Sequence, residues 1–97
     1  MKLQFEWDEN KNTINKRKHG VSFEEAVMVF SDPERYEMFD GIHSIFEKRW
    51  KTIGLAGWNV LIVSFTESID TIRIISARKA DKNFIEEYFY GYGKTGN

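Results

Sequence analysis

Apolar and polar positions follow two different periods along this chain, and together they predict five strands and three helices. Strict alternation, as at residues 3–7, is typical of a short strand with one buried face. A continuous run of apolar and β-branched residues, as at 60–66, is typical of a central strand. On this basis we expect strands at 3–7, 35–39, 48–56, 60–66 and 71–77.

The first two helices are marked by capping residues. Asp8 can cap a helix that runs to about Lys18, and Gly20 is suited to end it in a left-handed conformation. Ser22 and Glu25 have the spacing of a capping box. Behind that box, apolar residues recur at 23, 26, 27 and 30, which predicts one buried helical face that ends before the proline at 33.

The last predicted helix follows Asp81, which can cap it. Its apolar face is formed by Phe84, Ile85, Tyr88 and Phe89. The resulting order of elements is β-α-α-β-β-β-β-α, which predicts an α+β fold with helices packed on a sheet. Short connections between the strands from 48 to 77 predict an antiparallel meander.

Length and composition indicate one small domain, which we place at 1–90, followed by a frayed tail at 91–97. Aromatic residues make up 15% of the chain and can fill its core. The absence of cysteine excludes disulfides and thiolate metal sites. With no signal-peptide core and no long apolar run, we expect a cytoplasmic protein that does not enter a membrane.

The net charge of −1 argues against a protein that binds a long duplex, but the cations are unevenly placed. One basic group is Lys16, Arg17 and Lys18, and a second lies between 73 and 82. The two histidines are far apart in sequence and no glycine-rich phosphate loop is present, so we expect neither a metal nor another cofactor.

The most informative stretch is 73–80, which begins as an apolar strand and ends just before the last helix. Arg73, Arg78 and Lys79 would lie near one end of a rigid sheet. Guanidinium groups bind phosphate oxygens through two hydrogen bonds, and an ammonium group adds a point charge. By itself this stretch could serve a nucleotide, a sulfate, a carboxylate or RNA.

A family resemblance covers about residues 5–88 in unbroken order. The residues that carry it are Phe5 to Lys11, Asn15, Lys18 to Ala26, Phe30, Asp32, His43, Glu47 to Arg49, and Arg73 to Ala80. This ordered set resembles the BrnT toxins. The resemblance implies a RelE-like antiparallel sheet with two N-terminal helices and a C-terminal helix packed on it. It further implies a ribonuclease toxin of a bacterial type II toxin–antitoxin pair. It also implies a BrnA antitoxin as partner, operator DNA reached only through that antitoxin, and allows a toxin–antitoxin heterotetramer.

Two positions depart from the family pattern. Ser68 stands where family members often carry arginine, which would remove one cation from the active face. Phe84 stands where a glutamate would complete a capping box with Asp81, a change we interpret as structural.

Metal-free RNA cleavage by the 2′-hydroxyl needs a base, an acid and cations for the developing phosphate charge. The candidate catalytic residues are His19, His43, Glu47, Arg49, Glu67, Arg73 and Arg78. The candidate phosphate-binding residues are Lys16, Arg17, Lys18, Arg73, Arg78 and Lys79. The assignment of base and acid among His19, His43 and Glu67 stays open at this point.

Each candidate also has a plain structural interpretation. His19 can compensate the helix dipole, the arginines can form surface ion pairs, and the lysines can be solvated. Two other functions therefore compete with the ribonuclease: a weakened toxin that still binds its antitoxin and co-regulates the operon, and a simple RNA-binding domain.

Overall fold

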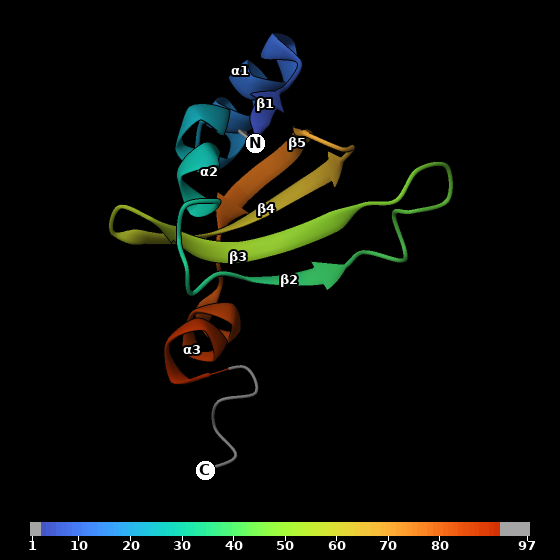
Figure 1. Cartoon of the computed structure of the whole chain (residues 1–97). Coiled ribbons are helices and arrows are strands. Elements are labelled where there is room, and N and C mark those ends of the chain that lie inside the picture. The colour runs from blue at the N-terminus through green and yellow to red at the C-terminus, as the bar shows by residue number, and fades with distance from the viewer. Residues whose placement is uncertain (1–2, 92–97) are drawn as a thin grey trace.

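The computed structural model describes residues 3–91, and their elements follow the predicted order (Figure 1). The elements are β1 (Gln4–Glu6), α1 (Glu9–His19), α2 (Phe23–Val29), β2 (Tyr36–Phe39), β3 (Trp50–Ala56), β4 (Asn59–Glu67), β5 (Thr71–Lys79) and α3 (Lys82–Tyr90). The predicted ends differ from these by one or two residues. Most of the tail expected at 91–97 lies outside the described residues.

The five strands form one sheet in the order β1-β5-β4-β3-β2. Neighbours from β2 to β5 are antiparallel, which confirms the predicted meander. β1 runs parallel to β5, so the sheet is mixed and not antiparallel throughout as expected. The parallel pair is possible because residues 7–70 lie between these two strands and can supply the crossover. The α+β class is confirmed.

One face of the sheet holds the larger core, beneath α2. Phe23, Ala26 and Val29 are fully buried there and pack against apolar side chains from β4 and β5. The predicted capping box is present, since the Ser22 hydroxyl accepts from the backbone N–H of Glu25 and the Glu25 carboxylate accepts from that of Ser22. α2 therefore has the buried face that its sequence predicts.

α1 has no such apolar face and is docked by two buried asparagines. Its one large apolar residue, Ile14, is exposed, whereas Asn12 and Asn15 are buried. The Asn15 amide donates to the carbonyl of Ala77 at 2.8 Å and accepts from the Ala77 N–H at 3.2 Å. These bonds satisfy the outer edge of β5 beyond the three residues of β1 that pair with it. α1 thus replaces a strand neighbour at that edge.

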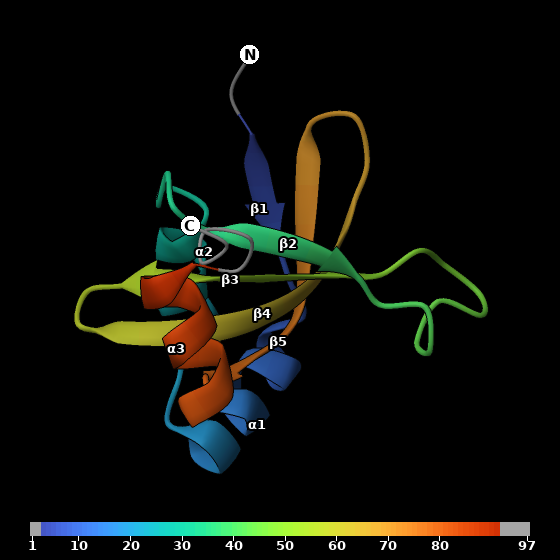
Figure 2. The same ribbon diagram turned by 90° about the horizontal axis from the view of Figure 1, so that it is seen from below.

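The opposite face of the sheet is covered only in part, by α3 (Figure 2). Phe84 and Tyr88 pack on the smaller core formed by Ile53, Val60 and Ile62. The prediction of a four-residue apolar face on α3 was too wide, because Ile85 and Phe89 are exposed.

A buried hydroxyl fixes α3 to the rest of the domain. The Tyr88 hydroxyl donates to Asp32 Oδ2, which also accepts from the Leu55 N–H. Figure 2 shows α3 near the β3–β4 turn and the long β2–β3 loop at the other end of the sheet. This placement leaves the sheet face next to that loop uncovered by helix.

Candidate functional site

The uncovered part of this sheet face carries a cavity of about 200 Å³, which we call the cationic pocket. Strands β3, β4 and β5 form its floor and the β2–β3 loop forms its wall. Its lining residues are Asp40, His43, Arg49, Lys51, Ile62, Ser64, Ile75, Ser76 and Arg78. Three cations and a histidine therefore lie together in one small cavity. Such a concentration of positive charge attracts an anionic ligand.

A β-bulge directs Arg78 into this pocket. Ser76 pairs with Ser64, but the next pair toward the start of β5 is Ile74 with Phe65, so Ile75 has no partner. In a regular strand, residues five positions apart point to opposite faces. The extra residue reverses that alternation, and Arg73 and Arg78 lie on the same face.

His43 lies on the β2–β3 loop and is bonded to Asp40. The ring Nδ1 of His43 lies 2.9 Å from Asp40 Oδ2, and its backbone N–H donates to Oδ1 at 3.3 Å. Burial alone would raise the pKa of Asp40, but the hydrogen bonds from His43 and the charges of His43 and Lys51 hold that pKa below its ordinary value.

An ionised Asp40 can only accept hydrogen bonds, so Nδ1 of His43 must carry a proton. Nε2 is then the nitrogen left to exchange a proton with a ligand. The Asp40 side chain is 11% exposed and that of His43 is 60% exposed, so the orienting acid is sheltered and the imidazole is accessible.

Arg49 enters the same pocket from the end of the loop. The loop is closed at its base by the Asp40 N–H, which donates to the carbonyl of Arg49 at 2.9 Å, and by the Ser44 hydroxyl, which accepts from the Arg49 N–H at 2.9 Å. The Nε of Arg49 is buried and has no hydrogen-bond partner among the described residues. A buried donor without a partner favours an acceptor from a ligand.

Several of the other candidate residues line a second cavity, which is formed by the ends of β1, β4 and β5 and by the β2–β3 loop. Its lining residues are Glu6, Glu47, Lys48, Thr66, Glu67, Ser68, Thr71 and Arg73. Arg73 lies 4.0 Å from the Glu6 carboxylate and is half exposed. Such an ion pair contributes little stability, and the guanidinium stays accessible to solvent and to ligands.

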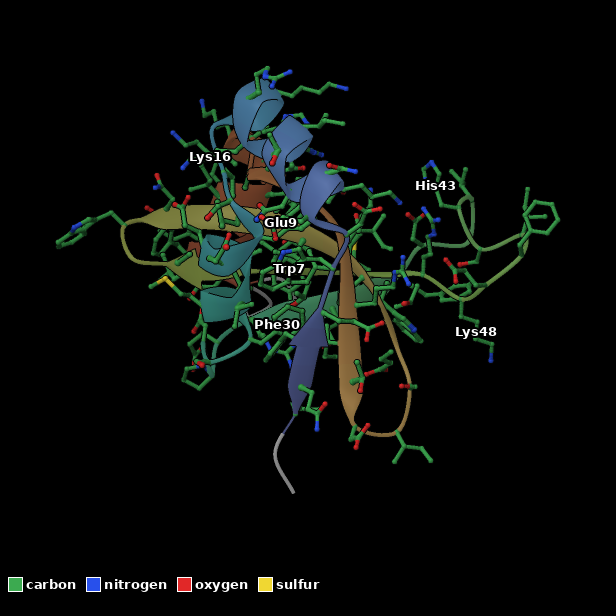
Figure 3. All side chains as sticks on the ribbon, turned by 90° about the horizontal axis from the view of Figure 1, so that it is seen from above. Trp7, Glu9, Lys16, Phe30, His43 and Lys48 are labelled. Carbon is green, nitrogen blue, oxygen red and sulfur yellow. The ribbon has the colours of Figure 1, made fainter. Side chains whose placement is uncertain are left out.

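The basic residues of α1 lie elsewhere. Lys16 and Arg17 line a groove between α1 and α2, together with Glu9 and Glu24. Figure 3 shows Lys16 and His43 on well-separated parts of the molecule. His19, the last residue of α1, does not line the cationic pocket.

Residues 7–83 match the family of BrnT, the ribonuclease toxin of type II toxin–antitoxin systems. The chain belongs to the BrnT family. It is therefore a member of a family of ribonuclease toxins, for which RNA is the target and an antitoxin protein is the partner. No individual curated protein matches the chain.

Of the site residues expected for this BrnT chain, the pocket brings together His43, Arg49 and Arg78. Lys79 is not with them, because it pairs with Leu61, which is buried in the core beneath α2. Residues paired directly across two strands share a face, so Lys79 lies on the side away from the pocket.

Sequence reasoning missed four polar residues of the pocket, which are Asp40, Lys51, Ser64 and Ser76. A signal existed for two of them. Asp40 stands three positions before His43, and Lys51 alternates with Ile53, so it shares a face with that residue. The serines give no signal before the strand register is known.

The two departures from the family pattern have different consequences in this fold. Ser68 lines the second cavity and not the cationic pocket, so an arginine at this position would add its charge to the second cavity. Phe84 is half-buried against the smaller core, and its N–H donates to Asp81 Oδ1 at 3.1 Å, as the predicted cap requires.

No helix between residues 3 and 91 is long and apolar enough to cross a membrane. Over the same range, no three acidic or histidine side chains gather to form a metal site.

Proposed function

We propose that this BrnT protein is a metal-independent endoribonuclease toxin whose reaction takes place in the cationic pocket. The observation that carries the proposal is the Asp40–His43 pair beside Arg49, Lys51 and Arg78. These groups can meet the needs of RNA cleavage by the 2′-hydroxyl, namely proton transfer and stabilisation of negative charge.

In the proposed reaction, Nε2 of His43 takes the proton from the 2′-hydroxyl. The 2′-oxygen forms a bond to phosphorus, the bond between phosphorus and O5′ breaks, and O5′ takes a proton from water. The products are a 2′,3′-cyclic phosphate and a 5′-hydroxyl. Arg49, Lys51 and Arg78 stabilise the charge that develops on the phosphate oxygens.

The role of Asp40 in this proposal is to position His43. It fixes the proton on Nδ1 and aims Nε2 outward, as a carboxylate does for a catalytic histidine in other hydrolytic sites. Arg73, Glu67 and Glu47 line the second cavity, where we propose that Arg73 holds a neighbouring phosphate of the RNA.

For its biology, we propose a BrnA-like antitoxin that neutralises the toxin in the cytoplasm and carries it to operator DNA. The strip at Lys16, Arg17 and Lys18 is exposed and distant from the pocket. It is a candidate contact for the antitoxin or for distant parts of the RNA.

One observation favours a second candidate, a weakened toxin that survives as the antitoxin-binding partner. Ser68 leaves the second cavity with one cation fewer than the family pattern supplies. That cavity still holds Lys48 and Arg73, however, and the cationic pocket holds Arg49, Lys51 and Arg78. Retained cleavage is therefore the stronger expectation.

The test is cleavage of labelled RNA by the purified protein in excess EDTA. We expect cleavage products that end in 2′,3′-cyclic phosphate, and no cleavage at a bond whose 2′-hydroxyl has been replaced by hydrogen. Cleavage that disappears with EDTA contradicts metal independence, and cleavage of the 2′-deoxy bond contradicts 2′-hydroxyl attack. Antitoxin binding with no cleavage at all would support the weakened toxin.

A further inference from the structure

The β2–β3 loop exposes a group of large apolar side chains directly beside the cationic pocket. Phe46 is 99% exposed and Ile45 is 79% exposed. Exposed apolar side chains that gather in one place mark a surface that becomes covered in function. These side chains lie on a loop whose base is closed by hydrogen bonds at Asp40, Ser44 and Arg49.

A hollow of about 260 Å³ lies against these side chains, lined by His43, Ile45, Phe46, Glu47 and Arg49. It shares His43 and Arg49 with the cationic pocket. A ligand whose charged part is held by Arg49 therefore has an apolar surface within reach on the same side of the loop. The chemistry required is an anionic group joined to a flat apolar group.

A nucleotide of single-stranded RNA has this chemistry. Proteins that bind single strands commonly hold the phosphate with cations and stack the base on an aromatic side chain. We propose that Phe46 and Ile45 form a stacking subsite for the nucleobase next to the phosphate held in the cationic pocket. The proposal rests on the proposed ribonuclease function and names a specificity subsite for it.

The molecule supplies a matched control in Trp58. It is 98% exposed, like Phe46, and both side chains flank β3. Phe46 belongs to the β2–β3 loop and Trp58 to the β3–β4 turn, and this loop and this turn lie at opposite ends of the sheet (Figure 1). Trp58 is therefore remote from the cationic pocket, and it is not among the residues that line that pocket.

The experiment measures RNA affinity and cleavage for the parent, Phe46→Ala, Phe46→Trp and Trp58→Ala. The affinity probe is an oligoribonucleotide that carries a 2′-deoxy residue at the cleaved bond and so stays intact. Stacking on an aromatic side chain contributes about 1–3 kcal/mol per base. We expect Phe46→Ala to weaken binding by about 5- to 150-fold, Phe46→Trp to bind at least as well as the parent, and Trp58→Ala to match the parent.

A second probe removes the base itself, by an abasic ribose on either side of the reacting phosphate. With the abasic ribose at one of these two positions, the parent and Phe46→Ala should bind the probe with equal affinity, because the base that would stack on Phe46 is absent. If Phe46→Ala keeps the parent's RNA affinity, the proposal of a stacking subsite at Phe46 is wrong. If it loses affinity only for the antitoxin protein, the loop is a protein-binding surface instead.

Failure of the subsite is distinguishable from failure of the ribonuclease proposal. A parent protein that binds the intact probe but cleaves no RNA contradicts the ribonuclease proposal alone. In that case, a selective loss of RNA affinity in Phe46→Ala relative to Trp58→Ala would still support the subsite.

Discussion

Arg78 lies on the same face of β5 as Arg73, although a separation of five positions would place the two side chains on opposite faces of a regular strand. The cause is the unpaired Ile75, which shifts the register between Ser64 and Phe65 of the neighbouring strand. The bulge therefore brings Arg78 onto the face where the β2–β3 loop presents His43.

The same register gives a test with two neighbouring residues. We predict that Arg78→Ala lowers kcat for RNA cleavage by about 10²- to 10³-fold, because it removes one donor that stabilises charge in the transition state. Lys79→Ala removes a cation one position away, on the other face of the sheet. Its kcat for RNA cleavage should stay within about threefold of that of the parent. Equal losses in the two variants would contradict the placement of the site.

Asp40 gives a second prediction, which separates positioning from binding. Asp40→Asn should lower kcat by about 10- to 100-fold while KM changes little, because the imidazole loses the partner that fixes its tautomer and direction. Steady-state kinetics over a range of pH measure this. A variant with the parent's kcat, or one whose only change is a higher KM, would contradict the positioning role.

The contact between Tyr88 and Asp32 predicts the stability of α3 docking. Tyr88→Phe should lower the free energy of unfolding by about 1.5–3 kcal/mol, since a hydrogen bond to a charged group is lost from a buried site. Thermal unfolding measures the change, and Tyr90→Phe is the matched control because Tyr90 is 72% exposed. A loss of similar size in both variants would contradict the assignment.

The same contact has a pH dependence of known sign. Burial opposes ionisation of Asp32, but hydrogen bonds from Tyr88 and from the N–H groups of Leu55 and Glu34 hold its pKa below 3.8. A carboxyl group whose pKa is lower in the folded than in the unfolded state stabilises the fold at any pH above its unfolded-state pKa. This contribution to stability is lost as the pH falls through the folded-state pKa. We therefore expect parent stability to fall below about pH 4, and Asp32→Asn to show a smaller fall.

Packing around Gly54 gives a prediction that concerns the fold alone. A Cβ at this position would lie 2.8 Å from the Cβ of Arg35 and 2.9 Å from Val29. Gly54→Ala should therefore destabilise the protein by about 1–3 kcal/mol in urea unfolding. Gly41→Ala, whose Cβ would meet only Phe39 at 3.6 Å, should be close to neutral. If the two variants are equally stable, the close packing of β3 against α2 is wrong.

The local signals in the sequence predicted the elements well, because caps and periodicity act within a few residues. Asp8, Ser22 and Asp81 all cap as expected. Long-range pairing was harder to foresee. Nothing near Ile75 marks it as a bulge, since its missing partner belongs to another strand. The polar docking of α1 through Asn15 likewise depends on a strand edge at Ala77, 62 positions away, that β1 does not pair with.

The candidate site was predicted only in part, because its residues come together through long-range strand pairing. His43, Arg49 and Arg78 were singled out by their chemistry and by the family resemblance, yet the sequence could not tell which candidates meet. The strand register decides that Arg78 enters the pocket while Lys79 faces away. Asp40 was missed because its role depends on the hydrogen bond it forms with His43.

In the proposed reaction, everything depends on the proton that His43 transfers during RNA cleavage in the cationic pocket. The most direct measurement is the single-turnover rate of RNA cleavage in excess EDTA for the parent and for His43→Ala. We predict that the parent cleaves and that the variant is slower by about 10²- to 10⁴-fold while it still binds RNA. A His43→Ala variant that cleaves as fast as the parent would contradict proton transfer by His43.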